Sequence, residues 1–166
     1  MPPVAVNLSA DSIMDPLLSD KVRERLHRYQ VLGTQLELEV IEDAIKGDSS
    51  VFRKTLEELV RMGIKLSIDD FGTGYSSLLR LKNLPFTKLK IDRSFIQDLP
   101  QDPDDCAITL SILGMARGLG LNVVAEGVEN QEQEAWLQHQ GCNYLQGLKY
   151  HEPMPIDAFL ELMITA

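Results

Sequence analysis

The chain has 166 residues, of which 44% are hydrophobic and 25% are charged, and its formal net charge is −9. This composition fits one globular domain with enough chain for a core, and it excludes a disordered or fibrous protein. The acidic excess also argues against a protein that binds long nucleic acids, so an anionic substrate would need a cation or a local basic group.

Short β-branched runs alternate with helical patterns from one end of the chain to the other. Six strands are predicted, at residues 4–7, 36–41, 64–69, 88–91, 122–125 and 144–146. Apolar residues at helical spacing predict one-faced helices between them, with Leu18, Val22, Leu26 and Tyr29 on the first and Phe52, Leu56, Leu59 and Val60 on the next. Asp15 and Pro16 suit the N-cap and the first position of the first helix.

This strict alternation of strand and helix indicates an α/β fold. Alternating βα units imply parallel strands joined by right-handed crossovers. Both an open doubly wound sheet and part of a (β/α)8 barrel satisfy the pattern, and composition does not choose between them.

Polar side chains are concentrated where the predicted strands end. They are Asn7, Glu39, Glu42, Asp69, Asp70, Lys90, Asp92, Glu126, Glu129 and Gln146. The carboxyl ends of parallel strands form one face, which is the usual place for catalytic groups in a barrel. Solvation and helix capping explain many acids at strand ends, so any single one of these residues has that simpler interpretation.

The adjacent carboxylates of Asp69 and Asp70 are the most informative pair. Two like charges a few Å apart require a cation or a raised pKa. Ligands that are rich in oxygen and contain no histidine favour Mg2+ or Mn2+ over zinc. This chemistry suits hydrolysis of a phosphodiester supported by two metal ions. Lys90 would stay charged among these acids and orient a water or phosphate, or it would only close the acidic ring with a salt bridge.

Other residue patterns set the expected environment. Cys106 and Cys142 are far apart in sequence and have no Cys or His at metal-ligand spacing, which predicts neither a disulfide framework nor a zinc site. The N-terminus lacks a signal-peptide pattern, and no apolar run reaches the roughly 18 residues that a membrane span needs. We therefore expect a cytoplasmic protein that is not inserted directly in a membrane.

Several of these segments together resemble the EAL domain family. They are Val-Asn-Leu-Ser at 6–9, Leu-Glu-Val-Ile-Glu at 38–42, Asp-Asp-Phe-Gly-Thr-Gly-Tyr-Ser-Ser-Leu at 69–78, Leu-Lys-Ile-Asp at 89–92, Val-Ala-Glu-Gly-Val-Glu at 124–129 and Gln-Gly at 146–147. The resemblance runs through the whole chain. It implies a barrel of the (β/α)8 type, two Mg2+ or Mn2+ ions, and hydrolysis of cyclic di-GMP to linear pGpG.

The resemblance also implies roles for individual residues. By matching position, Asn7, Glu39, Asp69, Asp70 and Glu126 resemble the metal ligands. Lys90 resembles the lysine that positions the attacking water, and Gln146 resembles a glutamine that holds a metal-bound water. We assign catalytic roles to Lys90, Glu126 and Gln146, and Glu42 resembles the glutamate that anchors the loop from Phe71 to Leu78. Asp92, Tyr150 and Pro153 are assigned to substrate binding.

Three departures from the family pattern stand out. Ile41 occupies a position where threonine is usual, and His151 and Glu152 replace commoner residues before Pro153. The Glu-Ala-Leu motif, with its metal-ligand glutamate and the following arginine, is absent. We therefore expect residues 1–166 to form a single partial EAL domain containing the third to eighth strands of the family, as an incomplete barrel of about six βα units.

Such an incomplete barrel leaves the first and last strands as exposed edges. We expect either self-association, such as a homodimer, or a rearranged smaller barrel. A GGDEF or sensor domain is expected in a longer parent protein. The absent glutamate leaves two functions open: a cyclic di-GMP phosphodiesterase of weak or lost activity, and a non-catalytic cyclic di-GMP receptor or interaction module.

Overall fold

A six-stranded sheet forms the centre of the computed structural model, which describes residues 3–45, 50–74 and 78–165. The strands are β1 (Val4–Leu8), β2 (Leu36–Ile41), β3 (Lys65–Phe71), β4 (Lys88–Ile91), β5 (Asn122–Ala125) and β6 (Tyr144–Leu145). The six predicted strands are confirmed, with ends that shift by at most two residues.

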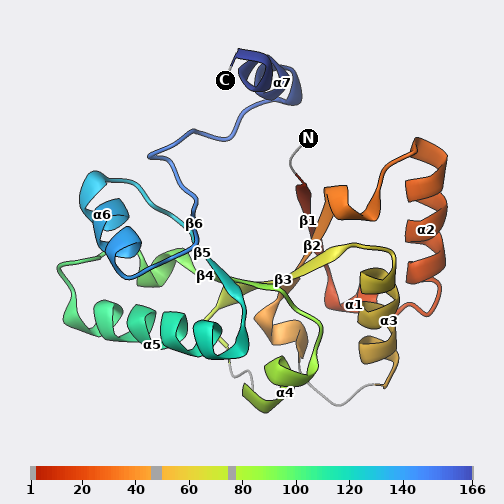
Figure 1. The fold of residues 1–166 in the computed structure, drawn as a ribbon, viewed down its shortest axis with the longest axis horizontal. Coiled ribbons are helices and arrows are strands. Elements are labelled where there is room, and N and C mark those ends of the chain that lie inside the picture. The colour runs from red at the N-terminus through yellow and green to blue at the C-terminus, as the bar shows by residue number, and fades with distance from the viewer. Residues whose placement is uncertain (1–2, 46–49, 75–77, 166) are drawn as a thin grey trace.

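All neighbouring strands pair in parallel, in the order β1-β2-β3-β4-β5-β6. Within the described ranges, no pairing joins β6 back to β1. Figure 1 shows the strands as an open arc with α1–α6 around its outside and α7 at the top of the view, near the N-terminus. The prediction of an incomplete (β/α)8 barrel of six βα units is therefore confirmed.

The helices follow the strands in the order that a barrel requires. They are α1 (Ala10–Ile13), α2 (Leu18–Tyr29), α3 (Ser50–Arg61), α4 (Leu78–Asn83), α5 (Pro103–Leu119), α6 (Gln131–His139) and α7 (Ile156–Thr165), with 3-10 turns η1 (Gly33–Gln35), η2 (Glu42–Ile45) and η3 (Arg93–Phe95). None of the helices in the described part of the chain is long and apolar enough to cross a membrane.

The two faces of the sheet differ in polarity because strand residues alternate between them. The outer face supplies buried Leu38, Val40, Leu66, Ile68, Leu89 and Val123, which share one core with Leu56 and Leu59 of α3, Ile112 and Leu113 of α5 and Leu137 of α6. On the inner face, the alternate positions of β2 and β4 are Glu37, Glu39, Lys88 and Lys90. Charged side chains thus line the inside of the arc.

Helix α2 begins later than predicted. The Asp15 carboxylate accepts a hydrogen bond from the Leu17 backbone N–H at 2.9 Å, and the helix starts at Leu18. Asp15 and Pro16 therefore form a preceding turn and are not the cap and first residue of the helix. Tyr29 was predicted on the buried face, but it is 63% exposed because α2 lies beside β1, an edge strand of the sheet that the described residues form.

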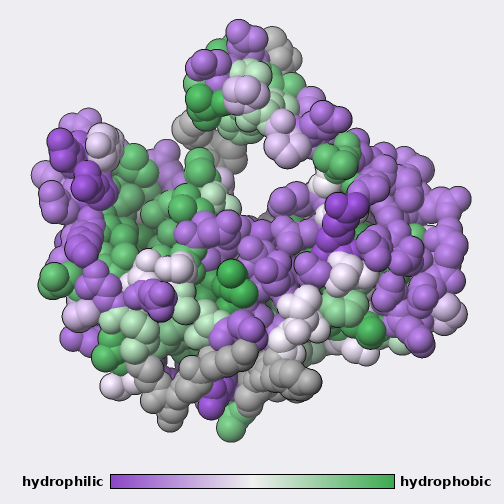
Figure 2. Space-filling view, turned by 180° about the vertical axis from the view of Figure 1, so that it is seen from behind, coloured by the Kyte–Doolittle hydropathy of each residue, from purple (hydrophilic) through white to green (hydrophobic). Residues whose placement is uncertain are grey.

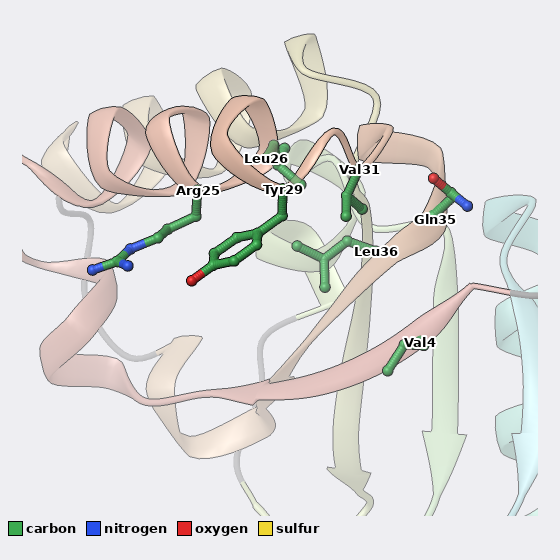
Figure 3. Close-up of a pocket in the computed structure, with 7 residues that line it drawn as sticks. All are labelled: Val4, Arg25, Leu26, Tyr29, Val31, Gln35 and Leu36. Carbon is green, nitrogen blue, oxygen red and sulfur yellow. The ribbon is translucent and has the colours of Figure 1, made fainter. Parts of the chain in front are cut away.

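Two apolar hollows lie beside the open edge at β1. One, of about 290 Å³, is lined by Val4, Leu26, Tyr29, Val31 and Leu36, and Figure 3 shows Tyr29 and Leu26 extending from α2 toward the strands. The other, of about 570 Å³, separates Val4 from Phe159 and Met163 of α7 and opens below this helix at the top of Figure 2. The exposed edge that the sequence predicts is therefore apolar in the structure.

Gly33 in η1 offers a test of how this turn packs against Met62, the residue after α3. A Cβ atom at Gly33 would lie 1.9 Å from the backbone oxygen of Met62, whereas one at Gly114 on α5 would meet nothing within 4 Å. We expect Gly33→Ala to lower the free energy of unfolding by roughly 1–3 kcal/mol, measured by urea denaturation. Gly114→Ala, the matched control, should raise it by about 0.5–1 kcal/mol because alanine favours the helix. Equal effects of both substitutions would contradict this packing.

Candidate functional site

Lys90 lies at the centre of an acidic cluster on the inner face of the sheet. Its Nζ atom is 2.9 Å from Glu39, 2.9 Å from Asp69 and 2.8 Å from Glu126. The Lys90 side chain is 7% exposed, so these ion pairs are shielded from water. An ammonium group has three N–H donors, and three carboxylates surround this one.

The parallel register explains why these residues meet. Asn7 pairs with Glu39 across β1 and β2, and Glu39 pairs with Ser67, two residues before Asp69. Lys90 lies on β4, and Glu126 follows β5 directly, with its backbone N–H bonded to the Ile91 oxygen at 3.2 Å. The carboxyl ends of four neighbouring strands thus contribute to one cluster.

Asp70 joins this cluster through an irregularity in β3. Consecutive strand residues normally point to opposite faces, so Asp69 and Asp70 would be separated in a regular strand. The pairing of β3 with β4 shifts register between Ile68 and Phe71, and Asp70 has a left-handed backbone with φ 53°. Oxygens of Asp69, Asp70 and Glu126 consequently lie within 4.8 Å of one another. Bulges often re-aim side chains next to active sites.

The charges in the cluster shift its pKa values. Burial lowers the pKa of Lys90, but the carboxylates of Glu126, Asp69 and Glu39 next to Nζ outweigh this effect, so the pKa rises well above its ordinary value. Burial and the neighbouring charges of Asp69 and Asp92 raise the pKa of Asp70. Burial also raises the pKa of Glu126, although Lys90 opposes this. Lys90 therefore remains an ammonium group, whereas Asp70 and Glu126 take up protons more readily than free carboxylates do.

The donor set fits a hard divalent cation. With their side chains ionised, Glu39, Asp69, Asp70 and Glu126 outnumber the single charge of Lys90, and all their ligand atoms are oxygens, as Mg2+ and Mn2+ prefer. Asp69 Oδ1 is buried, and although Lys90 is 2.9 Å away, no described residue donates to it with hydrogen-bond geometry. A cation beside Asp69, Asp70 and Glu126 would satisfy this oxygen and offset the repulsion.

Glu42 supports the turn that follows Asp70. Its Oε2 atom accepts hydrogen bonds from the backbone N–H groups of Gly72 at 2.8 Å and Gly74 at 3.2 Å. A Cβ atom at Gly74 would lie 3.0–3.2 Å from Asp43 and Glu42, so glycine suits this close approach. The role of Glu42 as anchor of the loop from Phe71 to Leu78 stays a prediction. Residues 75–77 of the same motif lie outside the described residues.

Other predicted site residues lie around the cluster. Asn7 is exposed beside Glu39, and Gln146 is exposed after β6, where its backbone pairs with Ala125 and Val128. Asp92 caps η3 by accepting from the Ser94 backbone N–H at 2.9 Å. Tyr150 and Pro153 line a groove of about 590 Å³ that also includes Gln146. Their roles in substrate binding stay predictions.

Three interactions near the site were not predicted from the sequence. Arg93 pairs with Glu129 at 2.7 Å, Lys88 pairs with buried Glu37 at 2.6 Å, and Tyr150 donates to Glu134 at 2.9 Å. The partners are 16 to 51 residues apart. Alternation placed Glu37 and Lys88 on the same face as Glu39 and Lys90, so that pair alone was within reach of prediction.

Known proteins resemble this chain in sequence. The family model described as "EAL domain" matches residues 1–153. The bifunctional diguanylate cyclase/cyclic di-GMP phosphodiesterase MucR of Pseudomonas aeruginosa is 48% identical over 157 residues, which are 95% of this chain and 23% of MucR. The cyclic di-GMP phosphodiesterase NbdA of the same organism is 44% identical over 160 residues, which are 96% of this chain and 20% of NbdA.

Solved structures agree with the sequence comparison. The MucR phosphodiesterase in complex with cyclic di-GMP has a TM-score of 0.89 and 47% identity, covering 95% of this chain and 64% of that chain. BlrP1 of Klebsiella pneumoniae, solved as a calcium complex with cyclic di-GMP, has a TM-score of 0.80 and 34% identity, covering 89% of this chain and 38% of that chain. The chain thus spans less than a quarter of these curated relatives and under two thirds of these solved chains.

Asp70 provides a direct test of metal binding. Asp70→Asn removes one charge while keeping a residue type that tolerates the left-handed backbone. We expect it to weaken Mn2+ binding by about 10-fold or more, measured by titration calorimetry. Asp98→Asn, in an exposed loop, is the control and should bind Mn2+ like the parent. Equal Mn2+ affinities for Asp70→Asn and the parent would exclude Asp70 as a ligand.

Proposed function

The chain belongs to the EAL domain family, and from that premise we propose that it provides the catalytic groups of a cyclic di-GMP phosphodiesterase. The observation that carries the proposal is the buried Lys90 ammonium group surrounded by Glu39, Asp69 and Glu126, with Asp70 beside them. Known cyclic di-GMP phosphodiesterases among the relatives support the choice of substrate.

The reaction is hydrolysis of one phosphodiester of the cyclic dinucleotide. The oxygen of a water molecule joins phosphorus, the P–O bond to one ribose breaks, the leaving oxygen takes up a proton, and linear pGpG results. Asn7, Glu39, Asp69, Asp70 and Glu126 would hold two Mg2+ or Mn2+ ions. When bound, such ions lower the pKa of water and stabilise charge on the phosphate and the leaving oxygen.

Lys90 acts as a positive group that orients the reactants. Its raised pKa keeps Nζ protonated at neutral pH, so it donates hydrogen bonds and does not accept a proton from water. The contacts to Glu39, Asp69 and Glu126 fix Nζ at the strand ends. From there its positive charge can act on a neighbouring water or phosphate oxygen. Gln146 is the second polar group that we assign to water positioning.

We assign substrate binding to the groove that begins next to Glu126, at Gly127. Gln146, Tyr150 and Pro153 line it, together with Gly127 and Arg93. Its volume of about 590 Å³ lies in the usual range for small-ligand sites. Asp92 would border the same region because its charge acts on Asp70. We propose that a nucleotide half of cyclic di-GMP binds here while its phosphate meets the acidic cluster.

The setting in the cell is part of the proposal. This chain covers 23% of MucR, which is bifunctional and longer, and this supports a parent protein with a GGDEF or sensor domain. Cys106 and Cys142 are free thiols, which suits the cytoplasm. The apolar edge at β1 supports self-association, because Val4 and Val6 are 55% and 47% exposed.

Ile41 favours a second candidate function, a receptor that binds cyclic di-GMP without cleaving it. Ile41 pairs in register with Asp69 and is 45% exposed, so it places an apolar side chain beside the acids. Such a group supplies no ligand and no proton. A receptor would bind the dinucleotide at this site and release no product.

Product formation separates the two candidates. With Mn2+, we expect the chain to convert cyclic di-GMP to pGpG. The product would be measured by chromatography and mass spectrometry. Glu39→Gln and Asp69→Asn should each lower the rate by about 100-fold or more because they remove cation-binding charge. Glu132→Gln, on the exposed side of α6, is the control and should keep the parent rate. Binding without product would identify the receptor, and unchanged rates in both site variants would refute the metal-ligand assignment.

Self-association through β1 has its own test. We expect the unsubstituted 166-residue chain to form dimers or larger species at micromolar concentrations, as measured by light scattering. Val4→Lys with Val6→Lys should shift the protein toward the monomer because charged lysines on an edge strand oppose pairing. Leu79→Lys, at an exposed apolar position on α4, is the matched control and should not change the mass. If the unsubstituted chain is monomeric at all concentrations, this association is ruled out.

A further inference from the structure

The turn after β6 forms one wall of the groove beside the acidic cluster. The groove is lined by Arg93, Glu129, Gln146, Tyr150, His151 and Pro153, among others. It starts at Gly127, the residue after Glu126. The position of residues 147–151 therefore sets the width of the space next to the cluster.

Glu134 of α6 holds this turn through both of its carboxylate oxygens. Oε1 accepts a hydrogen bond from the Tyr150 hydroxyl at 2.9 Å, and Oε2 is 3.3 Å from Lys149 Nζ. The Glu134 side chain is 15% exposed, so both contacts are partly shielded from water. Burial and the Glu134 carboxylate raise the pKa of Tyr150 to about 12, which keeps the phenol protonated and able to donate.

The backbone holds the base of the same turn. Val128 donates to the Gln146 oxygen at 3.0 Å, and Lys149 donates to the Val128 oxygen at 3.0 Å. A Cβ atom at Gly147 would lie 2.1 Å from the Val128 oxygen. These contacts fix residues 146–149 against the loop after β5, but they do not reach the Tyr150 side chain. The Tyr150 hydroxyl is held by its hydrogen bond to Glu134.

We infer that Glu134 is a positioning residue, which holds the turn at Lys149 and Tyr150 so that the groove keeps the shape needed for the nucleotide part of the substrate. This inference rests on the proposed function, because it takes cyclic di-GMP as the ligand of the groove. Glu134 itself does not contact the ligand. Its two oxygens are already engaged, and Lys149 offsets its charge, so it adds little repulsion toward a phosphate.

Variants at Glu134 separate positioning from catalysis. Binding of cyclic di-GMP would be measured by calorimetry with Ca2+ in place of Mn2+, and turnover would be measured with Mn2+. We expect Glu134→Ala to raise both Kd and KM by about 10-fold and to change kcat by less than about 3-fold. Glu134→Gln can still accept from Tyr150 but lacks the charge for Lys149, so its effect should be smaller. Glu132→Ala, on the same helix and bonded to Gln101, should leave Kd and KM unchanged.

A second measurement follows the turn directly. Amide hydrogen exchange of residues 147–151 should become about 10-fold faster in Glu134→Ala, while exchange in β2–β4 stays the same. Combining Glu134→Ala with Tyr150→Phe should raise Kd by less than the product of the two single effects, because both act through one contact.

The possible outcomes separate failure of the inference about Glu134 from failure of the proposed function. An unchanged Kd in Glu134→Ala overturns the inference, whether or not exchange becomes faster, because the turn would then be held for stability only. Fully additive effects of Glu134→Ala and Tyr150→Phe overturn it as well. A parent chain that does not bind cyclic di-GMP overturns the proposed function and, with it, the nucleotide ligand of the groove, while faster exchange would still show that Glu134 holds the turn.

Discussion

The ion pairs of Lys90 connect four neighbouring strands, β2 to β5, at the end of the sheet where the acids gather. Its ammonium group lies 2.8–2.9 Å from Glu39, Asp69 and Glu126. Without this charge, three carboxylates would face one another in a region largely shielded from water, at a cost of several kcal/mol. The strands must therefore keep the register that brings Lys90 beneath the acids. The same arrangement explains the chemistry, because one ammonium group does not neutralise the whole cluster and oxygen ligands remain for divalent cations.

The backbone at Asp70 makes the cluster suitable for a metal ion. A regular β3 would direct Asp69 and Asp70 to opposite faces, and only one would reach the inside of the arc. The register shift and the left-handed conformation at Asp70 bring both into reach of Glu126. Glu42 then holds the next residues through Gly72 and Gly74. Local strain at one residue is thus supported by neighbouring hydrogen bonds, as is common at functional sites.

Sequence patterns predicted the elements with the strongest periodicity. The six strands and their parallel order followed from βα alternation, and Glu39, Asp69, Asp70, Lys90 and Glu126 were placed together because they share one position relative to their strands. The start of α2 was predicted wrongly because the Asp15 carboxylate bonds to the Leu17 backbone N–H and to Lys21, and the helix begins at Leu18, two residues after Pro16. The bulge in β3, the bond from Tyr150 to Glu134 and the exposure of Tyr29 depend on contacts between distant segments. Such contacts leave no periodic signal in a single sequence.

The acids around Lys90 should form a divalent metal site. Diffraction at the manganese absorption edge from a crystal of the chain grown with Mn2+ would locate the ions. We expect anomalous peaks within direct coordination distance of the carboxylates of Asp69, Asp70 and Glu126. Anomalous peaks only at other acids on the surface, or none at saturating Mn2+, would contradict it.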